Sequence, residues 1–209
     1  MKRFSTKQFK DWIVSEVRQS IIDDAETAIK AFSRSGTGFF AVPRLLFPEI
    51  DGLGSYLTGE ADSTGKNIFT YLKRAMSLID PRYAEYAAFI TFIFRHGLLH
   101  QHSPKKFKYG EREFGWQFEI NTTNTPENIS RRNHLVFRNN LLLINMNLFY
   151  EDLVNSIDRF LAMVDTRQVS YKNINSAMQK QFGYLKRKDL SGRGKAFLNK
   201  DDLAFLKRI

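Results

Sequence analysis

The chain has 209 residues, a hydrophobic fraction of 43% and a formal net charge of +10. This is enough for one domain with a sizeable core, and it excludes a chain that is disordered throughout. There is no cysteine, which excludes disulfide bonds, thiolate catalysis and zinc–thiolate sites. No apolar stretch reaches the ~18 uncharged residues of a membrane span, and no signal-peptide pattern is present. We therefore expect a cytoplasmic protein.

The first third of the chain predicts a long helix followed by a loop. Ser5 or Thr6 is the expected N-cap, and apolar residues recur every three or four positions from there to Phe32. Segment 34–66 contains two prolines and several glycines, which favour turns over regular structure. We expect an ordered loop there, with at most short helical turns.

Two more helices are expected before the middle of the chain. The second runs from Ser63 or Thr64 to Ile79, with an inward apolar stripe. Asp80 followed by Pro81 is typical of a helix start, with the acid as N-cap and the proline in the first turn. The third helix is apolar nearly all round over residues 83–94, which predicts a helix buried in a core.

The hydrophobic period then changes from helical to alternating. Segment 102–113 predicts a basic loop, and about 113–145 predicts a small antiparallel β insertion. Within it, Asn139-Asn140 is the expected two-residue turn of a hairpin, and 121–132 an exposed loop.

A last bundle helix is expected from about residue 147 to Val164. We therefore expect a domain over 1–166 and a basic helical appendage over 167–209. The appendage has eleven basic and three acidic residues, a net charge of +8, whereas residues 1–166 carry +2. Such a charge suggests a polyanionic partner, so the appendage is expected to contribute binding and not fold.

A cation and two imidazoles close the apolar third helix. Burial of Arg95 would be costly unless it is paired or faces an anion-binding pocket. Arg95 and His100 are five residues apart, so a continuous helix would separate their directions by roughly 140°. If Gly97 loosens the last turn, the two side chains converge on one ligand. A guanidinium can bind the oxygens of a phosphate through two parallel hydrogen bonds, and an imidazole beside it can give or take a proton near neutral pH.

The segment Arg95-His96-x-x-x-His100 resembles the Arg-x(4–6)-His signature of the HEPN superfamily of small all-helical proteins, with its polar residue directly after the arginine. A compatible helical context extends over residues 5–165. The resemblance implies a mainly α, up-and-down helical bundle, carrying here the β insertion and the appendage. Many HEPN proteins are metal-independent endoribonucleases of toxin–antitoxin, abortive-infection (phage-defence) and RNA-processing systems.

The resemblance also implies roles for the three residues. His100 would act as general base or acid, Arg95 would stabilise charge on the scissile phosphate, and His96 would position RNA. The ribose 2′-hydroxyl would be the nucleophile, giving a 2′,3′-cyclic phosphate with no metal or other cofactor. A homodimer with both motifs in a shared cleft is implied, and an antitoxin or other protein partner is possible. Expected nucleic-acid contacts are Lys105, Lys106, Lys108, Lys186, Arg187, Lys188, Arg193 and Lys195.

Other interpretations of the histidines and the motif stay open. Cations at a helix C-terminus are favoured by the helix dipole without any function, which leaves a non-catalytic nucleic-acid- or protein-binding module. His96, His100 and His102 could bind a metal, but no carboxylate is placed as a further ligand, so no metal site is expected. His134 is expected to be a surface or packing residue.

Overall fold

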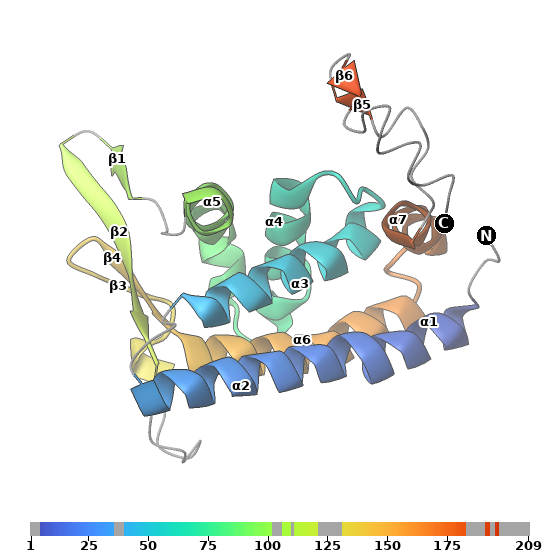
Figure 1. The fold of residues 1–209 in the computed structure, drawn as a ribbon, viewed down its shortest axis with the longest axis horizontal. Coiled ribbons are helices and arrows are strands. Elements are labelled where there is room, and N and C mark those ends of the chain that lie inside the picture. Colours follow the sequence, from blue (N-terminus) through green and yellow to red (C-terminus); the bar gives the residue numbers. More distant parts are fainter. Residues whose placement is uncertain are drawn as a thin grey trace.

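The computed structural model describes residues 5–35, 40–101, 106–109, 111–120, 131–182, 191–192 and 195–196. The fold is mainly helical, with a small mixed sheet at one end of the helices and α7 at the other (Figure 1). The α-helices are α1 (Thr6–Trp12), α2 (Gln19–Ser35), α3 (Ala41–Thr58), α4 (Thr64–Arg74), α5 (Arg82–Gln101), α6 (Met146–Asp165) and α7 (Tyr171–Phe182). None of the helices in these ranges is long and apolar enough to cross a membrane.

The expected first helix is confirmed, and it begins with a capping box. The Ser5 hydroxyl accepts from the Gln8 amide, while the Gln8 side chain accepts from the Ser5 amide. A π-helical segment, Ile13–Arg18, joins α1 to α2, so that the three form one long rod beside α6 (Figure 1). Its buried face includes Phe9 and Ile13.

The prediction of a loop over 34–66 is wrong, because the 18 residues of α3 lie within this segment. Pro43 lies in the first turn, where its missing N–H costs no helical hydrogen bond. Pro48 lies inside the helix and is tolerated there. The burial of apolar side chains stabilises α3 by more than the two prolines destabilise it. The buried residues recur at helical spacing: Val42, Leu46, Ile50, Leu53 and Leu57.

The glycines of this segment serve close packing and helix termination. A Cβ at Gly54 would lie 2.2 Å from the backbone oxygen of Asn67, so α3 and α4 can approach only because this residue has no side chain. Gly59 ends α3 with a φ of 76°.

The hairpin in the β insertion is confirmed. β3 (Val136–Arg138) and β4 (Leu141–Asn145) pair antiparallel around Asn139 and Asn140, whose φ values of 48° and 62° suit a primed two-residue turn. A short 3₁₀ turn, η4 (Arg131–Asn133), precedes β3.

The purely antiparallel arrangement is wrong. β2 (Arg112–Glu119) runs parallel to β4, and β1 (Phe107–Tyr109) forms an edge strand within the expected basic loop. The strand order is β1-β2-β4-β3, which makes β4 an inner strand. The apolar run of β4 is buried over most of its length, as fits a strand with neighbours on both sides.

Packing continues beyond the expected domain boundary at residue 166. α7 places Ile174, Ala177 and Met178 in the common core, against α3. Its polar side chains also bond to the end of α3: Asn173 donates to the Leu57 carbonyl (2.8 Å) and Ser176 to the Gly59 carbonyl (3.0 Å). The first part of the basic appendage therefore contributes to the fold.

Truncation at two positions separates the contribution of α7 to stability from that of the residues after it. A chain ending after Phe182 keeps α7 and is expected to unfold cooperatively. A chain ending after Thr166 exposes the α3 face that α7 covers, and is expected to lose at least about 3 kcal/mol, since each fully buried large apolar side chain contributes ~1.5–3 kcal/mol. Urea denaturation of both chains measures the difference, and equal stabilities would contradict the role of α7.

Candidate functional site

The residues that resemble the HEPN signature lie in the last two turns of α5. This helix starts as expected, with Asp80 accepting from the Arg82 amide (3.0 Å), and it runs without interruption through Gln101. The backbone is therefore helical at Gly97, and the expected loosening of the last turn is not found. The side chains of Arg95, His96 and His100 lie outside the described part of the structure.

The helical register nevertheless places two of these positions. Position 95 follows the exposed Ala88 by seven residues, and position 100 follows the buried Ile93 by seven. Residues seven apart share a helix face, so the two positions continue different faces of α5, separated by roughly 140°. Within one chain, the helical backbone therefore does not direct residues 95 and 100 towards a common ligand.

The expected nucleic-acid contacts are only partly placed. Lys106 and Lys108 are exposed at β1, and Lys106 pairs with Glu113 at 3.0 Å. The backbone at Lys195 lies in the short strand β6 (Lys195–Ala196), paired with β5 (Ser191–Gly192). The others fall outside the described residues: Lys105, Lys186, Arg187, Lys188 and Arg193.

A buried polar cluster lies beneath the first turn of α5. Tyr83, His134 and Asp152 are each 0% exposed. The Tyr83 hydroxyl donates to Asp152 Oδ2 at 3.0 Å and lies 3.0 Å from His134 Nε2. Arg131 donates two hydrogen bonds to the Asp152 carboxylate, at 3.1 and 2.6 Å. Of the two roles expected for His134, the structure shows packing, since the side chain is buried, and it adds hydrogen-bonding partners that the sequence did not indicate.

A second ion pair extends this cluster to the start of α5. Asp80 accepts hydrogen bonds from the Arg82 guanidinium and lies 3.6 Å from Arg131. Arg82 also donates to the backbone oxygen of His134 (2.6 Å). We call these six residues the polar cluster: Asp80, Arg82, Tyr83, Arg131, His134 and Asp152. It ties the start of α5, η4, the segment between η4 and β3, and α6 together.

Charge in the polar cluster is stabilised by its hydrogen bonds. Burial raises the pKa of the Asp152 carboxyl, but hydrogen bonds from His134 and Arg131 outweigh it, so this pKa lies below its usual value. Burial and the Asp152 carboxylate together raise the pKa of Tyr83 well above its usual value. Asp152 is therefore ionised at neutral pH, and Tyr83 remains a neutral donor.

The polar cluster is suited to support and not to substrate binding. Its central side chains are fully buried, so a substrate reaches them only if α5, η4 and α6 separate. The next residue, Leu135, has a φ of 52°, in the left-handed region that a branched side chain avoids. The hydrogen bonds of the cluster hold the chain in this turn, and so fix the sheet against α5 and α6.

No arrangement of three or more His, Asp or Glu side chains able to hold a metal occurs among the residues that the structure describes. Comparisons with known proteins give no match to a family model, to a curated protein or to a solved structure.

Proposed function

We propose that the protein is a metal-independent endoribonuclease that resembles the catalytic HEPN proteins and acts as a homodimer. The observation that supports this best is where the motif lies. Arg95, His96 and His100 are carried by the end of α5, whose earlier turns are fixed by Tyr83, by other buried residues and by the polar cluster. A catalytic pair requires a support that is held in place by packing, and the earlier turns of α5 meet this requirement.

A composite site follows from the register of α5. Since one continuous helix directs positions 95 and 100 about 140° apart, the two groups act on one phosphate when they come from different protomers. In a two-fold dimer, Arg95 of one protomer would stabilise the phosphate and His100 of the partner subunit would transfer the proton. His96 would position the RNA. The 2′-hydroxyl attack would need no metal.

A non-catalytic RNA- or protein-binding module is the second candidate. The uninterrupted helix at Gly97 favours it, because this backbone gives the motif no local means of convergence. The excess of positive charge over residues 167–209 favours RNA as the ligand of such a module.

A cleavage assay with chelator separates the two candidates. Purified protein is incubated with structured and unstructured RNAs in excess EDTA, and the product ends are analysed. The nuclease proposal expects chelator-resistant cleavage with 2′,3′-cyclic phosphate ends, from protein that is dimeric by light scattering at micromolar concentration. Intact RNA across the whole set would leave the binding module as the function.

A further inference from the structure

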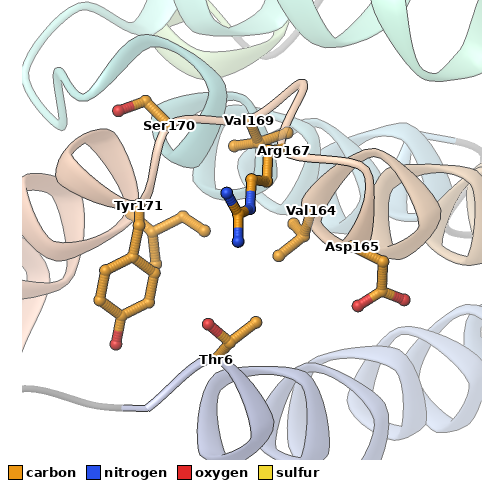
Figure 2. A pocket seen from close by; sticks show the side chains of 8 residues that line it. Thr6, Val164, Asp165, Arg167, Val169, Ser170 and Tyr171 are labelled. Atoms are coloured by element: carbon orange, nitrogen blue, oxygen red, sulfur yellow. The ribbon is translucent and has the colours of Figure 1, made fainter.

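Two hollows adjoin at the junction of α6 and α7, and they share one residue, Tyr171. The first, of about 320 Å³, is bounded by the end of α6, the start of α7 and Thr6 at the start of α1 (Figure 2). The second, of about 470 Å³, follows α7 along Lys172, Asn175 and Gln179. Both volumes lie within the ~300–1,000 Å³ that is usual for small-ligand sites.

Arg167 stands at a position that helix geometry favours for glycine. α6 ends in a Schellman motif, in which the Gln168 amide donates to the Met163 carbonyl (2.9 Å) and the Arg167 amide to the Val164 carbonyl (3.1 Å). The φ of Arg167 is 60°, a conformation that glycine adopts without strain. Figure 2 shows its guanidinium reaching into the first hollow, between Val164 and Tyr171.

The charge balance of the junction favours an anion. Asp165 also lines the first hollow, but Lys10 lies 2.7 and 2.8 Å from its carboxylate oxygens and compensates its charge. The side chains of Arg167 and Lys172 make no hydrogen bond or ion pair with any residue that the structure describes. Tyr171, which lines both hollows, is 36% exposed.

We infer that this junction is a subsite for one nucleotide of single-stranded RNA, an inference that rests on the RNA-directed function proposed above. The ring of Tyr171 is the surface on which a base stacks. Arg167 holds the adjacent phosphate through two parallel hydrogen bonds, and Lys172 holds the next phosphate as a point charge. The amide side chain of Gln179 offers donors and an acceptor to the base edge. The Asn175 amide nitrogen donates to the Tyr171 carbonyl (3.1 Å), which leaves its oxygen and second N–H for the base. The subsite would fix the strand on elements other than α5.

The test measures binding of a 2′-O-methyl oligouridine, which has no free 2′-hydroxyl and is not cleaved. Fluorescence anisotropy over a salt series gives both affinity and salt dependence. Tyr171→Ala is expected to weaken binding at least about fivefold without changing the salt slope, and Tyr171→Phe to retain affinity, because stacking needs only the ring. Arg167→Gly is expected to lower the slope of log K against log salt by about 0.7, the value for one phosphate contact on a single strand.

Two features keep this test independent of folding and of general charge. Arg167→Gly relieves a left-handed arginine, so its melting temperature should equal or exceed that of the unmodified protein. Arg159→Ala removes the same charge from an exposed site on α6 that lines neither hollow. It is expected to leave the salt slope unchanged.

The possible failures are distinguishable. Unchanged binding by Tyr171→Ala and Arg167→Gly, in a protein that binds and cleaves RNA, overturns the subsite and leaves the nuclease proposal. Weakened binding by both variants, in a protein that cleaves no RNA, supports the subsite and removes the nuclease. An equal loss of slope in Arg159→Ala shows diffuse charge and overturns the subsite. An unmodified protein without affinity for the oligouridine also overturns it.

Discussion

Arg131→Ala is expected to lower the free energy of unfolding by about 3–5 kcal/mol at pH 7, the usual cost of leaving one partner of a buried ion pair alone. The Asp152 carboxylate is fully buried, whereas the Arg131 side chain is 45% exposed. Removing the arginine therefore takes the guanidinium away from a buried carboxylate, which keeps its hydrogen bonds from Tyr83 and His134 but loses its charged partner. The converse change, Asp152→Asn, leaves a cation that can turn towards solvent, so we expect a smaller loss of about 1–3 kcal/mol. Urea denaturation measures both.

The double variant is the matched control for this prediction. Arg131→Ala combined with Asp152→Asn removes both charges of this pair, so no buried carboxylate is left without its arginine, and the double variant should be more stable than Arg131→Ala alone. Strictly additive losses would show that the two side chains do not act as a pair, and would contradict the geometry of the polar cluster.

The same pair predicts a dependence on pH. Because the folded pKa of Asp152 lies below its unfolded value, the stability that it contributes is present above the unfolded pKa, near 4, and is lost as pH falls through the folded pKa. In Arg131→Ala the Asp152 carboxyl loses the hydrogen bonds and charge of the arginine, so its pKa rises and it protonates at a higher pH. The difference in stability between the two proteins should therefore narrow as pH falls towards about 4. A difference that stays constant from pH 7 to pH 4 would exclude the ion pair as its cause.

Local signals were sufficient wherever the controlling contacts are near in sequence. The helix starts at Ser5 and Asp80 and the Asn139-Asn140 turn were predictable, because each depends on residues within a few positions. α3 was missed because its prolines and glycines favour a loop locally. The burial of its apolar face and the close packing of Gly54 against α4, which stabilise the helix, depend on residues far from it in sequence.

Contacts between distant segments were beyond such reasoning. The parallel pairing of β2 with β4 depends on the path of the chain between them, and the docking of α7 depends on α3 carbonyls more than a hundred positions earlier. Asp152 did carry a usable signal. It stands beside Leu153 and three positions after Phe149, both core residues, and a carboxylate at such a position requires a partner. That partner, Arg131, could not be named from spacing.

The register of α5 also limits what the motif can do, and this makes the catalytic proposal testable by substitution. Arg95→Ala and His100→Ala are each expected to reduce chelator-resistant RNA cleavage at least ~100-fold, the lower end for a positioned acid–base group. The double variant should be little worse than either single one, because the groups act on one phosphate as a unit. Normal cleavage by both single variants would remove the nuclease proposal.

Mixing the two inactive single variants tests whether the site is shared between protomers. In a two-fold dimer, a mixed pair contains one intact site, with Arg95 from the His100→Ala chain and His100 from the Arg95→Ala chain, and one site that lacks both. Random exchange of equal amounts should therefore restore about a quarter of the original activity, since half of the dimers are mixed and each has one of two sites. A site built within one chain would stay inactive in every dimer. Activity after co-refolding, with each variant refolded alone as the control, distinguishes the two outcomes. Failure to recover activity, with mixed dimers present by mass, would place Arg95 and His100 in the same protomer and require the end of α5 to unwind at Gly97.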